Sequence, residues 1–159
     1  MIQITAATNA DVPVILEMIR ALALYEKLDH ACVATEDDLR TSLFGANPAA
    51  EVLIAWHDEE PAGFALFFHN YSTFLARRGL YLEDLFVKPQ YRGAGIGKAL
   101  LVRLARIAVE RQCGRFEWLV LDWNTPAIGF YQKLGAIPLA DWTIFRVTGE
   151  ALSRLARAS

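Results

Sequence analysis

Three glycines at alternate positions, Gly93, Gly95 and Gly97, separate an apolar segment from a long amphipathic one. A turn without Cβ atoms lets backbone N–H groups approach a ligand closely, and the first turn of a helix favours negative charge. A P-loop needs four residues between its glycine and Gly-Lys, then Ser or Thr; here three residues intervene and Ala99 follows. A dinucleotide fingerprint needs a third glycine where Leu100 stands. The pattern therefore predicts a phosphate-binding turn of another kind.

Two adjacent carboxylates precede this turn, in the apolar segment Leu80–Val87. We expect Glu83 to be a general base, acting directly or through a water, because partial burial in a strand raises a carboxyl pKa toward neutrality. The alternative is a carboxylate on the solvent face of an edge strand. Asp84 points to the opposite face of a regular strand, so either a bulge intervenes or the two acids have different roles.

Asn124 and Tyr131 lie in a second segment whose residue types suit catalysis. Asn124 precedes the expected helix Thr125–Leu134, where it could cap the helix, hydrogen-bond a ligand, or do both. Tyr131 could donate a proton to a leaving group, although a tyrosine at this position is also typical of a side chain that covers the edge of a core. The residues alone leave these alternatives open.

Four blocks of sequence together resemble the GNAT superfamily of N-acetyltransferases, and within it the diamine and polyamine (spermidine/spermine type) branch. The pattern Arg92-Gly-Ala-Gly95-Ile-Gly97 resembles the family's loop for the pyrophosphate of acyl-CoA. The other blocks begin at Ala23, Leu80 and Leu121. The resemblance implies an α/β (α+β) GNAT fold with a mixed, mostly antiparallel sheet of six to seven strands, about four flanking helices, and splayed central strands that bind CoA.

The resemblance also implies roles for individual residues in an acetyl transfer from acetyl-CoA to a primary amine. Tyr131 is the expected acid toward the CoA sulfur and Glu83 the expected base. A backbone N–H within Leu85–Val87, freed by a bulge, is expected to polarise the thioester carbonyl. The expected substrate contacts are Tyr25, Glu26, Glu83 and Asp84. The expected cofactor contacts are Leu85, Phe86, Val87, Arg92, Gly93, Ala94, Gly95, Ile96, Gly97, Lys98, Asn124, Pro126, Ala127 and Tyr131.

The sequence departs from the polyamine type in two places. The segment Asn70–Phe74 lacks the acidic residue expected there, and the segment Ala136–Trp142 is shorter and less acidic. Fewer acids favour a shorter, less charged amine than spermine, such as a diamine or an amino-acid-like amine. The alternatives are acetylation of a protein N-terminus or lysine, and a CoA-binding module without catalysis. Because no Cys or Ser is placed as an acyl-enzyme nucleophile, we expect direct transfer.

Length and charge fit this reading. One domain spanning residues 1–159 is large enough for a core, and 54% apolar residues argue against disorder. Residues 1–84 carry 13 acidic and 5 basic side chains, whereas residues 85–159 carry 5 and 11. This asymmetry suits an anionic cofactor on the second half and a cationic substrate on the first. No basic run interleaved with aromatics suggests nucleic-acid binding, and no apolar run is long enough for a membrane span.

The two cysteines, Cys32 and Cys113, are isolated, which favours a reduced, cytoplasmic setting and no metal site. The family resemblance implies a homodimer. Periodicity predicts helices from about Asn9 to Ala23, Thr35 to Phe44, Gly95 to Cys113, Thr125 to Leu134 and Glu150 to Arg157. Thr35 is the expected N-cap of the second helix, and Gly135 is the glycine expected just after the fourth. The apolar stripe of the third helix is expected to consist of Ile96, Leu100, Leu101, Leu104, Ile107 and Ala108. It predicts strands at Ile2–Thr5, Val52–Trp56, Ala62–Phe68, Leu80–Val87, Phe116–Leu121 and Trp142–Val147.

Overall fold

The computed structural model describes all residues, 1–159, and divides into two compact units, Met1–Leu121 and Asp122–Ser159. The single domain expected from chain length stays a prediction.

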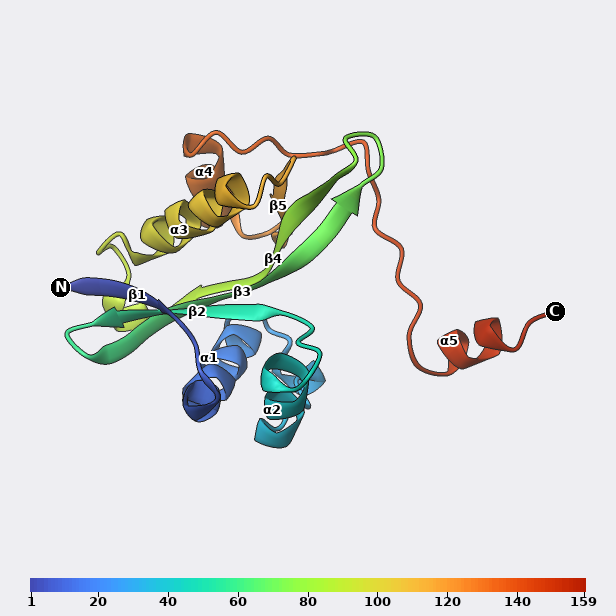
Figure 1. Ribbon diagram of the computed structural model, residues 1–159, viewed down its shortest axis with the longest axis horizontal. Coiled ribbons are helices and arrows are strands. Elements are labelled where there is room, and N and C mark those ends of the chain that lie inside the picture. The colour runs from blue at the N-terminus through green and yellow to red at the C-terminus, as the bar shows by residue number, and fades with distance from the viewer. The chain divides into compact units, whose positions relative to one another are not determined.

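The first unit is built on a five-stranded sheet in the order β1-β2-β3-β4-β5 (Figure 1). Neighbouring strands are antiparallel except β4 and β5, which run parallel and are joined by the helix α3 (Ile96–Glu110). The mixed, mostly antiparallel sheet is therefore confirmed. The strands are β1 (Ile2–Ala6), β2 (Glu51–His57), β3 (Glu60–Ser72), β4 (Arg77–Val87) and β5 (Phe116–Trp118).

The sheet has fewer strands than the six or seven expected. The expected strand Trp142–Val147 is not formed, and the strand expected over Phe116–Leu121 ends at Trp118. Both segments have the apolar composition of strands. A strand also needs a neighbouring backbone to pair with, and the ladder between β4 and β5 ends at the pair Leu82 and Trp118.

Helices α1 (Val12–Tyr25) and α2 (Glu36–Phe44) cover one face of this sheet (Figure 1). A short 3₁₀ turn, Asn9–Asp11, precedes α1, so the α-helix begins later than expected. The apolar stripes of both helices pack on alternate residues of the central strands. The main residues of this core are Val12, Ile15, Leu16, Met18, Leu22, Leu39, Leu43, Val52, Ile54, Phe64 and Phe86.

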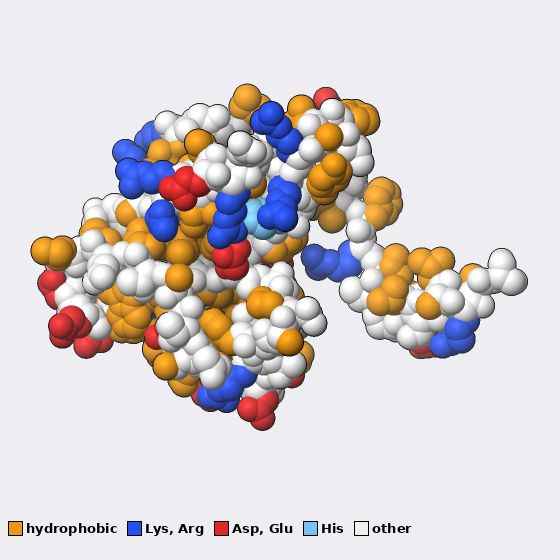
Figure 2. Space-filling view, viewed as in Figure 1, with side chains coloured by type: hydrophobic (Ala, Val, Ile, Leu, Met, Phe, Trp, Pro, Cys, Tyr) orange, Lys and Arg blue, Asp and Glu red, His pale blue; other side chains and the backbone are white.

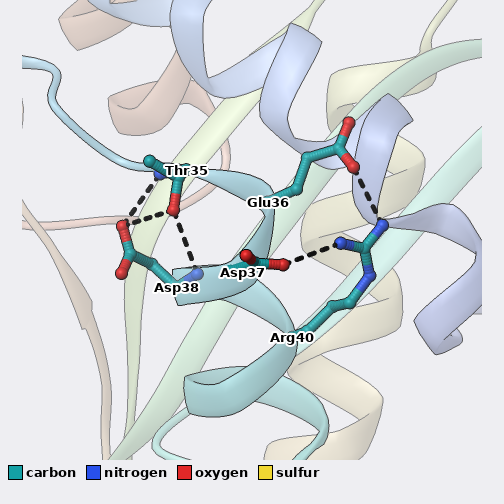
Figure 3. A network of polar contacts seen from close by, with 5 residues as sticks. All are labelled: Thr35, Glu36, Asp37, Asp38 and Arg40. Carbon is teal, nitrogen blue, oxygen red and sulfur yellow. Dashed lines mark hydrogen bonds and ion pairs between the residues drawn. The ribbon is translucent and has the colours of Figure 1, made fainter.

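The start of α2 follows the capping signal in its sequence (Figure 3). The Thr35 hydroxyl accepts from the N–H of Asp38 at 3.2 Å, and the Asp38 carboxylate accepts from the N–H of Thr35 at 3.0 Å. These hydrogen bonds to Thr35 hold the pKa of Asp38 below its usual value. One turn later Arg40 pairs with Glu36 at 2.8 Å. The predicted N-cap at Thr35 is thus confirmed.

Helix α3 (Ile96–Glu110) covers the opposite face of the sheet (Figure 1). Its buried residues are those of the stripe predicted from spacing: Ile96, Leu100, Leu101, Leu104, Ile107 and Ala108. Just beyond its end, Arg111 donates to both carboxylate oxygens of Glu51 at 2.6 and 2.9 Å and lies 2.8 Å from Nε2 of His69. These contacts attach the end of the helix to β2 and β3.

The second unit contains two helices, α4 (Thr125–Lys133) and α5 (Gly149–Ala156). The Asn124 side chain caps α4 by accepting from the N–H of Ala127 at 3.4 Å. Gly135 follows α4 with a φ of 94°, the left-handed conformation typical of a glycine after a helix. Both features were predicted. Across the two units, no helix combines the length and the apolarity that crossing a membrane requires.

Candidate active site

A β-bulge lies at Glu83 in β4. Leu82 pairs with Phe67 and Asp84 pairs with Leu66, so Glu83 is an extra residue opposite neighbouring positions of β3. A bulge of this kind interrupts the alternation of side chains between the two faces. Asp84 and Phe86 therefore share the face covered by α1, where Phe86 belongs to the core. The sequence allowed a bulge at Glu83 and Asp84 as one of two alternatives, and this bulge is present.

The bulge also redirects the main chain of β4. Before it, the N–H of Leu80 donates to the carbonyl of Arg115 at 3.0 Å, on the side of β5. After it, the N–H of Lys88 donates to a carbonyl of β3 at 2.8 Å, on the other side. Alternation then turns the N–H and C=O groups of Leu85 and Val87 toward the side of β5.

The ladder with β5 does not extend as far as these residues, because it ends at Leu82. The two strands thus part directly after the bulge, as the family resemblance implied. A short stretch of β4 edge is left to pair with another extended group, and an N–H on this edge can donate to a ligand.

Three carboxyl groups lie close enough to affect one another on this side of the sheet. Burial is the main cause that raises the pKa of Asp84 to about 7, and the negative charges of Glu83 and Glu26 raise it further. Burial, and then the charge of Glu83, also raise the pKa of Glu26. Glu26 follows α1 and the other two belong to β4. Such a cluster favours a cationic ligand.

The prediction that Glu83 itself is partly buried is wrong. Glu83 is exposed, whereas Asp84 is half-buried. The reason is the bulge, which places the extra residue outside the regular packing of β4 and turns the next residue toward α1. Burial, the cause invoked for a raised pKa, therefore acts on Asp84.

The glycine-rich turn between β4 and α3 has the open backbone expected of an anion site. Gly93 and Gly95 have φ of 85° and 81°, and Gly95 is the N-cap of α3. A Cβ at either position would meet no atom within 4 Å, so backbone conformation alone favours glycine there and the space around it stays open. Gly97 has no such φ, and a Cβ there would only touch Val87 at 3.8 Å. Two of the three glycines are thus required by the turn itself.

Arg92 points back from this turn to the acidic side of the site. Its Nε donates to the carbonyl of Val87 at 2.9 Å, and its guanidinium lies 4.9 Å from the ring centre of Tyr25 and 5.7 Å from that of Phe86. The sequence indicated a charge contact to a phosphate and did not indicate this contact. It depends on the return of α1 to the sheet, which spacing along the chain does not encode.

The expected site residues divide between the two units. The first unit brings together Tyr25, Glu26, Glu83, Asp84 and Arg92 beside the glycine-rich turn. Asn124, Pro126, Ala127 and Tyr131 belong to the second unit, at the start and in the middle of α4. There the Tyr131 ring lies 5.6 Å from that of Phe130, and both are partly buried.

Comparison with known proteins decides the family. The acetyltransferase (GNAT) family matches residues 19–136. This protein belongs to the GNAT family. It is an N-acetyltransferase, as are its named relatives. An L-ornithine N5-acetyltransferase, NATA1, of Arabidopsis thaliana is 36% identical over 96% of this chain and 87% of its own. A thialysine N-epsilon-acetyltransferase of Sus scrofa is 41% identical over 96% of both chains.

A solved structure has a similar fold over nearly the whole chain. An integron cassette protein from the mobile metagenome of V. cholerae has a TM-score of 0.84 and 27% identity, over 99% of this chain and 98% of that one. The GNAT fold predicted from the motifs is thus confirmed.

The raised pKa of Asp84 predicts a pH-dependent stability. Between about pH 4 and pH 7 the folded protein retains a proton that the unfolded chain releases, so its stability falls as pH rises through this range. Asp84→Asn removes this pH dependence of stability. The melting temperature of the variant, relative to that of the parent, therefore rises between pH 5 and pH 8. Asp29→Asn, at an exposed aspartate, serves as the control. Parallel melting curves for parent and Asp84→Asn would show that burial does not act on this group.

Proposed function

We propose that the protein transfers the acetyl group of acetyl-CoA directly to the primary amine of a small diamine or amino-acid-like amine. The observation that carries the proposal is the cluster of Glu26, Glu83 and Asp84 beside the parted strands, in a chain of the GNAT family. Acids at this place attract a cation and accept the proton that an ammonium must lose before it attacks.

The residues present fit the cofactor. The turn Gly93–Lys98 offers open backbone and the first-turn N–H groups of α3, which suit a pyrophosphate. The freed edge of β4 at Leu85–Val87 would pair with the amides of the pantetheine arm and polarise the thioester carbonyl through an N–H. For Asn124, Pro126 and Ala127, at the start of the second unit, we keep the cofactor contacts that the family resemblance implies. The bound cofactor supplies an acetyl thioester.

In the proposed reaction the amine first gives its proton to a carboxylate. The sequence predicts Glu83, directly or through a water, and the structure adds Asp84, whose pKa of about 7 matches the operating range of a general base. The amine nitrogen then forms the new amide bond while the C–S bond breaks. Tyr131 would donate its hydroxyl proton to the departing sulfur, and the second proton that the nitrogen loses as it becomes an amide would restore that hydroxyl. Since no nucleophilic Cys or Ser is used, the kinetics are sequential.

The acids present favour a substrate of modest charge. Tyr25 and Glu26 end α1 on the same face as Asp84, so a second amine or ammonium of the substrate can bind there. The two relatives named above act on ornithine and thialysine by their names, and each of these amino acids carries two amines. We therefore favour a diamino acid or short diamine over spermine.

A thiol-release assay with a panel of amines tests the proposal. We expect turnover with acetyl-CoA to be highest for ornithine, lysine, thialysine and 1,4-diaminobutane, lower for spermine, and lowest for a peptide with a free N-terminus or lysine. Preference for the peptide would support protein acetylation instead. If no amine in the panel causes thiol release, the alternative of a CoA-binding module without catalysis would be supported.

We further propose a cytoplasmic homodimer. Both cysteines are free thiols, as in a reducing compartment. The segment that follows α4 exposes large apolar side chains, including Ile137, Trp142 and Phe145. Exposed apolar residues in such number are typical of a surface that a partner covers. Sedimentation of the purified chain measures its oligomeric state.

A further inference from the structure

The Arg92 side chain joins the end of β4 to the end of α1. Its Nε donates to the carbonyl of Val87 at 2.9 Å, which fixes the plane of the guanidinium. The centre of this group lies 4.9 Å from the ring centre of Tyr25 and 5.7 Å from that of Phe86. Arg92 is thus in contact with the residue that precedes Glu26, on the acidic side of the site.

The end of α1 lies outside the apolar core. Leu22 is the last buried residue of the helix, and Leu24 and Tyr25 are exposed by 66% and 40%. Two residues after Tyr25 the chain turns at Lys27, whose φ of 62° is uncommon for a residue with a Cβ. Contacts at the surface therefore fix where the Tyr25 and Glu26 side chains lie, and a planar cation on an aromatic ring is such a contact.

The charge of Arg92 is not what distinguishes it here. No ion pair of the protein includes Arg92. Lys98 lies in the first turn of α3, and Figure 2 shows further Lys and Arg side chains gathered over this helix. The glycine-rich turn thus has other cations for a phosphate. What arginine adds at this position is a planar face with a directed N–H, and lysine has neither.

We propose that Arg92 is a positioning residue for the acceptor amine, which acts by holding the Tyr25 ring and the adjacent Glu26 beside Asp84. This inference rests on the amine site of the proposed function. A ring held in one position gives the second ammonium of the substrate a preformed site, so that less conformational entropy is lost when the amine binds. Arg92 contacts neither the reacting nitrogen nor the thioester, and its effect is therefore on amine affinity and not on the chemical step.

Arg92→Lys tests this role, because it keeps the charge and removes the planar face. Ornithine and 1,4-diaminobutane are the probes, titrated by calorimetry into the full chain saturated with CoA, which has no acetyl group to transfer. We expect Arg92→Lys to weaken amine binding about two- to fivefold, as the loss of an exposed cation–π contact predicts, and to keep the affinity for CoA. In thiol release, KM for the amine rises by a similar factor and kcat is retained. Arg20→Lys, at an exposed arginine of α1, is the matched control and changes neither affinity.

Variants of Tyr25 show whether Arg92 acts through the ring. Tyr25→Phe keeps the ring and Tyr25→Leu removes it. We expect Arg92→Lys to weaken amine binding in the Tyr25→Phe background as much as in the parent. In the Tyr25→Leu background it has no further effect, because the contact that it removes is already lost. Circular dichroism checks the folding of each variant.

Three results would overturn the proposal. If Arg92→Lys weakens CoA binding and leaves amine affinity unchanged, Arg92 is a cofactor contact. If it weakens amine binding equally in the parent and in Tyr25→Leu, it does not act through the ring. If it changes no affinity, or if neither amine binds the parent, Arg92 does not position an acceptor.

Thiol release with the amine panel separates this test from the proposed function. The expected pattern of amine affinities in a protein that releases no thiol would refute the acetyl transfer and keep the role of Arg92. Thiol release by the parent together with one of the three contrary results would refute the role of Arg92 alone.

Discussion

Tyr131→Phe is expected to lower kcat for acetyl transfer about tenfold or more and to leave the affinity for acetyl-CoA unchanged, because a single positioned proton donor contributes about 10²–10⁴-fold. Phenylalanine keeps the ring, which lies beside Phe130 in α4, and removes only the hydroxyl. Stopped-flow or steady-state thiol release measures kcat, and calorimetric titration measures the affinity.

Tyr71→Phe is the matched control, since Tyr71 is an exposed tyrosine of β3 outside the proposed site. Its kcat stays at the level of the parent. Equal turnover by Tyr131→Phe would remove Tyr131 from the mechanism, and the thiolate would then leave without a protein acid. A joint fall of kcat and cofactor affinity would instead assign Tyr131 to binding.

Gly95→Val is expected to abolish measurable binding of acetyl-CoA while the fold survives. The φ of 81° at Gly95 costs a residue with a Cβ about 1–2 kcal/mol, more for a branched one, and its side chain would enter the open space where the pyrophosphate binds. Calorimetric titration with acetyl-CoA measures the loss.

Gly149→Val separates strain from recognition. Gly149 also has a positive φ, 58°, and a Cβ there would meet no atom within 4 Å. It begins α5, which holds none of the proposed site residues. This variant bears a comparable backbone cost and keeps its affinity for acetyl-CoA. If Gly95→Val binds as well as Gly149→Val, the glycine-rich turn does not hold the pyrophosphate.

The sequence predicted the features that depend on residues near one another in the chain. The apolar stripe of α3 coincides with its buried side, Thr35 and Asn124 cap their helices, and Gly135 ends α4 in the left-handed conformation. Each of these features depends on residue spacing or local hydrogen bonding, which involve residues within one or two helical turns of one another. The glycine-rich motif that begins at Arg92, together with the blocks that begin at Ala23, Leu80 and Leu121, indicated the family, which the comparisons then confirmed.

Strand pairing limited the sequence-based prediction elsewhere. The segment Trp142–Val147 has strand composition, yet it forms no strand. Similarly, the pattern left open whether Glu83 is partly buried or lies on the solvent face, and the structure shows it exposed. Asp84 is the residue that burial affects, because the extra residue in the bulge reverses which face of β4 the following side chains occupy.

The sequence by itself determined that the protein is an N-acetyltransferase of the GNAT family, with a glycine-rich turn at the start of a long helix, because these properties are carried by residues within a few short motifs. Only the tertiary structure decided that Arg92 lies on Tyr25, that Asp84 is the half-buried acid, and that the ladder between β4 and β5 ends at Leu82. These features arise where separate elements meet, and the energy of burying a charge depends on the elements that surround it.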